Sequence, residues 1–537
     1  MPKSGYFIIF LFIIPRSVFG QFEYLQFNHS EYRSIERLAH KTGNERSHTS
    51  VRPFRSKDFA SIDSLNSVYA IKGKFENKWL WKKAFNERLV VVDVPGFSWR
   101  LDQIVDFAVG NESGSTEDKT LYTNTRGFFM EGRIGEQISF VSSFRENQAL
   151  LPFWVRDFSS KNLVIPGQGI SRSYSGPGRD FYTATGMLSY TPSNYFNFTF
   201  GFGNNFFGEG YRSMLLSDVA FPNTFLKIET TVWRIKYINL YNWMSDIRSE
   251  VMNVNVFAPK FNTMHYLSIN LGERWNLNFF EAIVWGDSLG NRGFDVNFLN
   301  PIIFYRPIEF AVGSSGGNAL MGFGLSYLLE DKWMVYGQFA LDEFNSKAIT
   351  GGGGNWTNKF AWQLGTKMYD AFGVEKLFLR GEYNAARPYT FSHKDVLTNY
   401  GHYNQPLGHL WGANFHEAIV QVAYDYKRYG AEWQFIYGLQ GNDDRDNYYG
   451  RGIYTSYDER PFDLGHNIAQ FNRSTLLLNE FRVYYMINPA IRLRAELGYT
   501  YRQLRFNKEI IGQLENQNHS VISFAVRTQL FNRYYDF

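Results

Sequence analysis

The sequence predicts an all-β fold, a closed transmembrane β-barrel of about 16–18 antiparallel strands. Two observations predict it. Apolar and polar residues alternate with a period of two over segments longer than an ordinary globular strand. The connections between these segments are short on one side and long on the other, which is typical of outer-membrane barrels with short periplasmic turns and long extracellular loops.

The clearest alternation lies in residues 474–501. In its second half, one face is apolar and aromatic and the other is mostly charged. The first face holds Ile491, Leu493, Ala495, Leu497, Tyr499 and Tyr501, and the second holds Arg492, Arg494, Glu496 and Thr500. The two halves meet at a tight turn in which Pro489 presets φ. Such a hairpin suits a wall between lipid and a hydrated lumen.

The same alternation recurs along the chain in pairs of arms. Phe196, Phe198, Phe200 and Phe202 share one face of a single arm. Further pairs are predicted at 264–271 and 275–285, 319–329 and 333–341, 357–368 and 376–385, and 415–426 and 431–439. Long loops are predicted at 146–180, 204–223, 287–317, 386–414 and 440–473. The stretch 224–262 is difficult to divide into strands.

Composition supports this class and excludes others. Aromatic residues make up 18% of the 537 residues, which fits the aromatic girdles of outer-membrane barrels. After the N-terminus, no apolar run reaches the ~20 residues that a membrane helix needs. The chain has no Cys, which excludes disulfides and thiol chemistry, and a net charge of +4 is too small to indicate nucleic acid. We therefore expect the lipid bilayer of a Gram-negative outer membrane as the surroundings of the protein.

Three parts are predicted along the chain. Residues 1–20 carry Lys3, a short apolar core and a small-residue end, the pattern of a cleavable signal peptide. Residues 21–87 lack sustained alternation and are expected to form an N-terminal periplasmic segment with short helices near 61–69 and 79–85. Residues 88–537 are expected to form the barrel. A final strand over 520–532, followed by a terminal aromatic residue, resembles the signal that barrel-assembly machinery reads.

Several separate motifs suggest a family. They lie at residues 203–218, which read GNNFFGEGYRSMLLSD, and at 300–319, 337–344, 387–407 and 532–537. Together they resemble the Wzi-like capsule assembly family of outer-membrane β-barrels, in the Bacteroidota branch that includes the gliding-motility protein RemB. The resemblance covers most of residues 88–537. It implies an outer-membrane barrel that attaches or handles surface polysaccharide, or one that assists surface motility.

Candidate ligand-binding residues lie in the first two motifs. Tyr211 would stack on a sugar ring, while Glu209 and Arg212 would bind hydroxyl or acidic groups. The alternative, which we favour, is a folded loop whose glycines make tight turns and whose charges pair locally. Arg306 and Glu309, from the second motif, complete the set of candidate binding residues.

Catalysis is not expected. Asp342 and Glu343 end a predicted strand and join Arg306 and Glu309 in a polar constellation. Paired carboxylates at a suitable separation cleave glycosides, but charged residues inside barrels more often brace the wall, and we favour that interpretation. No Gly-x-Ser-x-Gly nucleophile motif is present. The sequence therefore predicts a protein that is not an enzyme and uses no cofactor.

Metal sites are also not expected. The histidines at 393, 402, 409 and 416 are close in sequence, but they lack HExxH spacing and a carboxylate at zinc-ligand spacing. The acidic residues 441–447 lack the glycine and final glutamate of an EF-hand, which favours a solvated loop over a calcium site.

Three functions remain open. The leading hypothesis is a binding and surface-assembly protein whose partners are surface polysaccharide or motility or secretion-system proteins. The second is a porin, or a barrel subunit of an outer-membrane secretion or motility complex. The third is an outer-membrane hydrolase, which would need an acid in one of the loops.

Overall fold

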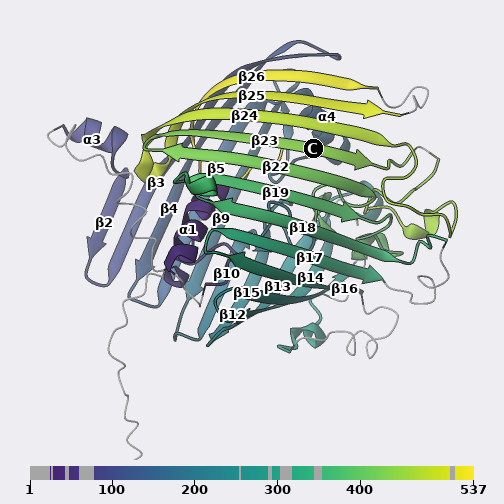
Figure 1. Ribbon diagram of the computed structural model, residues 1–537, viewed down its shortest axis with the longest axis horizontal. Coiled ribbons are helices and arrows are strands. Elements are labelled where there is room, and N and C mark those ends of the chain that lie inside the picture. Colours follow the sequence, from purple (N-terminus) through teal and green to yellow (C-terminus); the bar gives the residue numbers. More distant parts are fainter. Residues whose placement is uncertain are drawn as a thin grey trace, which may run out of the picture.

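One closed wall of antiparallel strands organises the protein (Figure 1). The computed structural model describes residues 24–25, 28–42, 47–59, 78–252, 256–287, 293–302, 317–343, 353–444, 446–507 and 515–537. Each wall strand pairs with the next one along the chain, and β26 pairs with β3 to close the cylinder. Eighteen of the described strands form this wall, which confirms the predicted antiparallel barrel and its size.

The wall strands follow the alternation of the sequence closely. Their bounds are β3 (Phe97–Gly114), β4 (Lys119–Ile134), β5 (Ile138–Leu150), β9 (Gly178–Tyr190), β10 (Phe196–Gly203), β12 (Asn223–Val232), β13 (Ile235–Asp246), β14 (Ala258–Leu271), β15 (Trp275–Gly286), β16 (Asn318–Leu329), β17 (Trp333–Glu343), β18 (Lys359–Tyr369), β19 (Leu377–Ala386), β22 (Phe415–Tyr426), β23 (Tyr429–Gln440), β24 (Ser474–Asn488), β25 (Leu493–Phe506) and β26 (Gln517–Thr528). The undivided stretch 224–262 holds β12, β13 and the start of β14. Trp233, between β12 and β13, is a turn residue with φ of 54°.

The outer face of the wall is apolar and the inner face is polar. On β25, Leu497 is 52% exposed and Tyr499 is 42% exposed, whereas Arg494 and Glu496 are buried in the lumen. Leaving one large apolar side chain in water instead of burying it costs about 1.5–3 kcal/mol, and the wall repeats this exposure on nearly every strand. A bilayer removes that cost, so the alternation is the pattern of a lipid-facing wall.

The two ends of the barrel differ as the sequence predicts. At one end the strands are joined by turns of a few residues, such as 135–137 and 272–274. At the other end most connections are long, and several carry small elements of their own (Figure 1, right). These are α4 (Phe153–Asn162), β6 (Val164–Ile165), β7 (Gly169–Ile170), β8 (Arg172–Tyr174), η2 (Ser249–Val251), η3 (Val296–Leu299), η5 (Val396–Thr398), β20 (Gly401–His402), β21 (Gln405–Pro406) and η6 (Tyr457–Glu459). The short turns after β18 and β24 hold η4 (Ala371–Gly373) and η7 (Pro489–Ile491).

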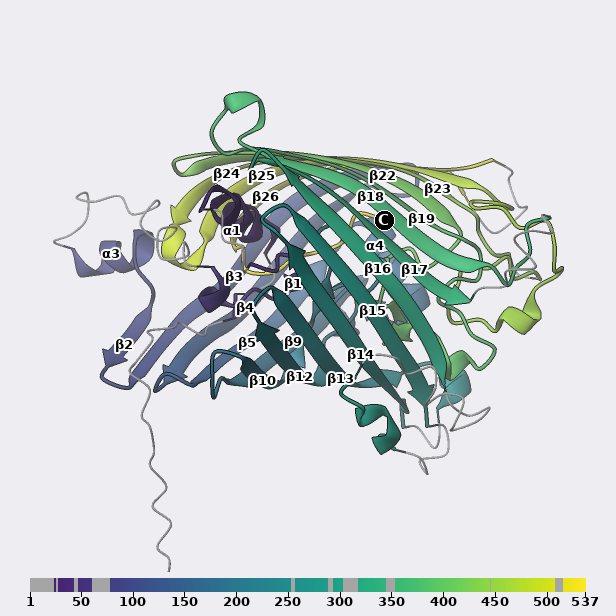
Figure 2. The ribbon, with the colours of Figure 1, turned by 60° about the horizontal axis from the view of Figure 1, so that its bottom comes forward.

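Helix α1 (His29–Thr42) occupies the mouth of the barrel at the short-turn end (Figure 2). Its N-terminus is capped by the Asn28 side chain, whose Oδ1 accepts from the backbone N–H of Ser30 at 3.0 Å. Its apolar face, which includes Tyr32 and Ile35, packs against Phe54. Its basic residues contact the barrel, where they form ion pairs with the wall strand β23 and with the turn after β18.

Farther along the N-terminal part, the chain runs deeper and then leaves the lumen. β1 (Val51–Arg52) pairs with β11 (Phe206–Phe207) inside the barrel, and η1 (Ser56–Asp58) follows it. α3 (Trp79–Phe85) lies beyond the short-turn rim and confirms the helix predicted near 79–85 (Figure 1). The signal peptide predicted at 1–20 and the helix predicted at 61–69 fall outside the described residues. No helix among the described residues is both long and apolar enough to cross a membrane.

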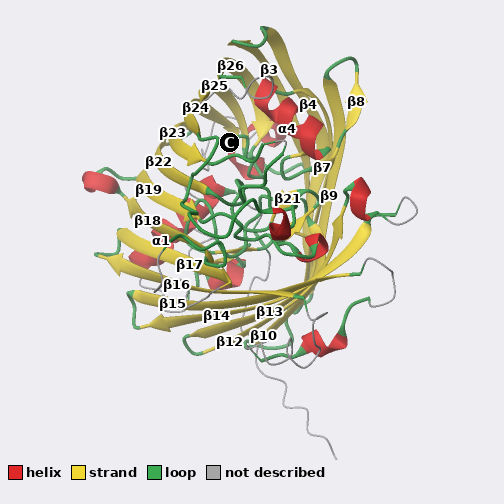
Figure 3. Ribbon diagram, turned by 90° about the vertical axis from the view of Figure 1, so that its right-hand side faces the viewer, coloured by secondary structure: helices red, strands yellow, loops and turns green. Residues whose placement is uncertain are grey.

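The prediction of a final strand reaching residue 532 is wrong. β26 ends at Thr528, and residues 529–537, here called the tail, turn into the lumen, where Figure 3 shows the C-terminus within the wall. Polar side chains of the tail find partners there that a lipid face could not supply; Asp536, for example, accepts from Gln434 at 2.7 Å. β2 (Val90–Val94) pairs with β3 along residues 97–101, the part of the β3 edge beyond the pairing with β26.

Candidate functional site

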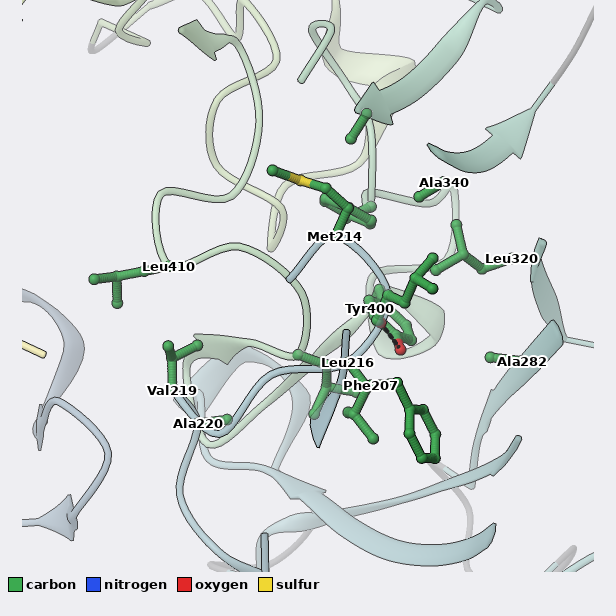
Figure 4. Packing of buried hydrophobic residues seen from close by; sticks show 14 of the residues in the cluster. Phe207, Met214, Leu216, Val219, Ala220, Ala282, Leu320, Ala340, Tyr400 and Leu410 are labelled. Atoms are coloured by element: carbon green, nitrogen blue, oxygen red, sulfur yellow. Dashed lines mark hydrogen bonds between the residues drawn. The ribbon is translucent and has the colours of Figure 1, made fainter. Parts of the chain in front are cut away.

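The loop after β10 folds into the lumen instead of standing outside it. Residues 204–223 were predicted as a long loop, and apolar side chains from it join the largest buried apolar cluster among the described residues. Met214, Leu216 and Val219 from this loop belong to the same cluster as Leu320 and Ala340 of the wall, and Figure 4 shows Met214 on the side of Ala340. We call this filled region, along β12–β22, the packed sector of the lumen.

The three candidate residues of the first motif lie together in the packed sector, and the side chains of all three are hydrogen-bonded to other residues of the protein. Glu209 accepts hydrogen bonds from Thr49 Oγ1 at 2.6 Å and from Lys367 Nζ at 2.7 Å. Lys367 also pairs with Glu36 of α1 at 2.9 Å, and Glu36 pairs in turn with Arg52 at 2.9 Å. This network joins the N-terminal part, the inward loop and the wall.

Tyr211 and Arg212 tie the same loop to the tail. The Tyr211 hydroxyl donates to Asp536 Oδ2 at 2.7 Å, and Arg212 Nη1 donates to Asp536 Oδ1 at 3.2 Å. Arg212, 1% exposed, also donates from Nη2 to Glu417 of β22 at 3.0 Å. Burial raises the pKa of Tyr211 well above its usual value, and the nearby Asp536 carboxylate raises it further. Burial opposes the charge on Arg212, but Asp536 and Glu417 outweigh it and raise the pKa of Arg212.

The structure does not bring the remaining candidates to this place. Arg306 and Glu309 fall outside the described residues. Asp342 is buried at the end of β17 and lies 3.5 Å from Lys359 Nζ, which is a bracing contact. The four histidines are spread over separate surroundings, such as His409 against Glu417 at 2.7 Å and His402 near Ser245. Among the described residues, no group of three or more such side chains has the arrangement of a metal site.

A second region of the lumen, along β23–β26, is hollow. This hollow sector holds two cavities at different heights. The larger, of about 1160 Å³, lies at the long-loop end, and we call it the outer vestibule. The smaller, of about 230 Å³, lies deeper and is called the inner cavity. Figure 3 looks into the barrel from the long-loop end and shows loops and α4 within the wall.

Aromatic rings and polar side chains alternate around the outer vestibule. The rings that line it include Phe153, Trp154, Phe158, Trp411, Tyr454 and Phe506. Amide and charged groups between them come from Asn162, Asn404, Gln440, Asn442, Arg451 and Arg502. Aromatic faces beside convergent amide and guanidinium groups form a surface that can stack on a sugar ring and hydrogen-bond its hydroxyls.

Two residues of the vestibule lining each have one buried polar atom without a partner. The indole Nε1 of Trp411, a residue that is 6% exposed, has no hydrogen-bond partner among the described residues. The side-chain oxygen of Asn404 is in the same situation. Both atoms are closed off from solvent, so a ligand in the vestibule reaches them only if the lining side chains turn.

The acidic loop 441–447 is part of the vestibule wall. The Asp443 carboxylate accepts from the backbone N–H groups of Tyr449 at 2.7 Å and Gly452 at 2.8 Å, so it organises the loop. Burial raises the pKa of Asp443, and these N–H groups lower it by a smaller amount. Sequence reasoning singled out this loop but missed Trp411 and Asn404. The signal for them was only the aromatic content of the loop 386–414, which does not show which side chains face a cavity.

Comparison with known proteins places the fold. No family model and no curated protein matches the chain. Among solved structures, the chain is similar to Wzi of Escherichia coli, an outer-membrane protein involved in group 1 capsule assembly and described as a carbohydrate-binding β-barrel. The TM-score is 0.52 at 11% identity, over 93% of this chain and 99% of Wzi. The chain is an outer-membrane β-barrel of the Gram-negative type.

Two further similarities concern other barrels of the outer membrane. OprD of Pseudomonas aeruginosa gives a TM-score of 0.39 at 10% identity, over 79% of this chain and 95% of OprD. OccAB4 of Acinetobacter baumannii gives 0.41 at 8% identity, over 80% of this chain and 97% of OccAB4. At identities this low, the likeness to Wzi concerns the fold alone.

Proposed function

We propose that this outer-membrane barrel holds surface polysaccharide in the outer vestibule and does not cleave it. The observation that carries the proposal is the vestibule itself, a cavity of about 1160 Å³ lined by aromatic rings with amide and guanidinium side chains between them. Sugars offer flat C–H faces for the rings and hydroxyls for the amide and guanidinium groups. The description of Wzi as a carbohydrate-binding barrel supports the same class of ligand.

The residues of the first motif have a positioning role in this proposal. Glu209, Tyr211 and Arg212 are each held by protein partners within the lumen, so they brace the packed sector and, through Asp536, the tail. The absence of cleavage remains part of the proposal. Asp443, one of three acids that line the vestibule with Asp157 and Glu515, is held by backbone N–H groups.

A glycan array with purified barrel tests the proposal. Trp411→Phe shortens one of the rings that line the vestibule, and we expect glycan affinity to fall about 2- to 10-fold, the range of one aromatic contact. Trp356→Phe is the matched control, because Trp356 lies on another long loop and does not line the vestibule. Equal affinity of the two variants and the parent would contradict the vestibule as the binding site.

Affinity purification from native outer membranes separates this function from the other candidate roles. Sugar that co-purifies with the barrel, and is lost in Trp411→Phe, supports polysaccharide binding. A stoichiometric protein complex without sugar would instead support a subunit of a motility or secretion assembly.

A further inference from the structure

The outer vestibule and the inner cavity are stacked along the same strands. On β25, inward-facing residues of the first part of the strand line the inner cavity, and those of the last part line the vestibule. The first set is Glu496, Gly498 and Thr500, and the second is Arg502, Leu504 and Phe506. β24, which is antiparallel to β25, shows the same arrangement in space. Glu480 and Arg482 line the inner cavity, and Leu476 lines the vestibule. The inward face of β24 and β25 thus runs through both cavities without a break. The open space beside it is interrupted between Thr500 and Arg502.

The tail makes that interruption. Phe537 lines the vestibule, whereas Tyr535 and Asp536 line the inner cavity. Trp154 of α4 lines both cavities and lies beside the end of the tail. The two spaces are therefore separated where the end of the tail meets α4.

The tail is held by side chains and not by strand pairing. Arg502 Nε donates to the main-chain oxygen of Phe537 at 2.7 Å, and Trp154 Nε1 donates to the main-chain oxygen of Tyr535 at 2.7 Å. Gln168 Nε2 donates to the Tyr535 hydroxyl at 3.0 Å. Asp536, between the two rings, is held in addition by Tyr211, Arg212 and Gln434. None of these described contacts belongs to the wall ladder, so the tail can leave its place without opening the barrel once they break.

The inner cavity suits small hydrophilic solutes. Both signs of charge line it, with Arg482 and Arg527 beside Glu480 and Glu496. Several of these charges pair with one another across the cavity wall, as Arg527 does with Glu496 at 3.1 Å. Balanced charges around a hydrated space favour polar solutes without selecting strongly for anions or cations.

We propose that the tail is a gate between the outer vestibule and the inner cavity, and that the hollow sector is a closable path for small hydrophilic solutes. This activity goes beyond holding polysaccharide. With the tail in place, Phe537 and Tyr535 close the path against Trp154. With the tail displaced, the strip along β24 and β25 is continuous from the vestibule into the inner cavity.

Cysteine labelling tests the gate, because the chain has no Cys of its own. Thr500→Cys places one thiol in the inner cavity, and a membrane-impermeant maleimide is added to cells from outside. The double substitution Tyr535→Ala/Phe537→Ala removes the two closing rings and keeps Asp536. We expect it to speed labelling at residue 500 by at least about tenfold, since access then no longer requires local opening of the tail.

The matched control is Tyr534→Phe, a tail substitution whose side chain lines neither cavity and should leave the labelling rate unchanged. Leu504→Cys, in the vestibule, should be labelled rapidly in every background. Heat-dependent gel migration verifies that each barrel is folded, and Phe537→Ala alone serves if the double variant does not fold. Equal labelling of residue 500 with and without the rings would overturn the gate.

Planar-bilayer conductance tests the path. The variant without the two rings should give discrete conductance steps that the parent and Tyr534→Phe give rarely. Faster labelling at residue 500 without any gain in conductance would overturn the proposed solute path, because the inner cavity would then have no exit at the short-turn end. Conductance that rises equally in Tyr534→Phe would overturn the assignment of the gate to Tyr535 and Phe537.

Discussion

The packed and hollow sectors of the lumen are built from the same kinds of residue but differ in how their polar groups are used. In the packed sector, Arg212 is fully buried and donates to two carboxylates. In the hollow sector, Arg482 pairs with one carboxylate and keeps about a third of its side chain exposed, at 32%. Charges in the first region brace the fold, and those in the second border a space that a ligand or solute can enter.

The largest expected difference in folding free energy between the sectors comes from removing one arginine side chain from each. Arg212→Ala leaves Glu417 and Asp536 buried without their guanidinium and should cost about 3–5 kcal/mol of folding free energy. Arg482→Ala should cost at most about 1 kcal/mol, because a partly exposed pair contributes little. Denaturant-dependent unfolding in lipid vesicles measures both. Equal losses would remove the distinction between the two sectors.

A single methyl group gives a second and smaller test. A Cβ at Gly210 would lie 2.6 Å from the Arg212 carbonyl oxygen and 2.6 Å from Glu382 Oε2, so Gly210→Ala should cost about 1–3 kcal/mol. At Gly498 the nearest atom is the Ser523 hydroxyl at 3.0 Å, and the next lies at 3.9 Å. Gly498→Ala should therefore change stability by less than about 1 kcal/mol. A larger loss at Gly498 than at Gly210 would mean that the sector called hollow is the tighter one.

The fold was predictable from sequence wherever one residue in two faces lipid. Leu497 and Tyr499 opposite Arg494 and Glu496 identified β25, and the same alternation located most wall strands. The arrangement inside the lumen was not predictable. Arg212 and Asp536 are 324 residues apart in sequence, and no local pattern indicates that they meet. For the same reason, the sequence favours a folded loop with locally paired charges for the first motif, whereas the partners that hold Glu209 and Arg212 are distant in sequence.

The smallest predicted effect concerns the short-turn mouth, where the packing of the lumen is held by α1. Burial alone would raise the pKa of Asp370, but hydrogen bonds from Arg37 and Lys41 outweigh it and lower the pKa to about 2. Because the folded value lies below the usual one, this contact stabilises α1 docking above about pH 4 and is lost as the pH falls toward 2. The hydrogen-exchange protection factors of residues 28–42, which are corrected for the intrinsic exchange rate at each pH, should fall modestly over that range.

Asp370→Asn is the control for this pH dependence, since an amide does not titrate. The substituted protein should show lower protection factors in α1 at neutral pH and no further fall between about pH 4 and pH 2. A fall in the variant equal to that in the parent would assign the pH dependence to other carboxylates, such as Glu36, which is buried against Arg52 and Lys367.

The pairing of β2 with residues 97–101 of β3 bears on how the cylinder closes during biogenesis. Closure joins the first and last wall strands, which are the most distant in sequence and therefore the slowest to meet. Only nine residue pairs join β26 to β3, against sixteen between β3 and β4. The rest of that edge is covered by a local hairpin, which forms quickly and leaves the short strand β2 as the edge. The pairing that must form last is thus short, because the hairpin already occupies the remainder of β3 when β26 arrives.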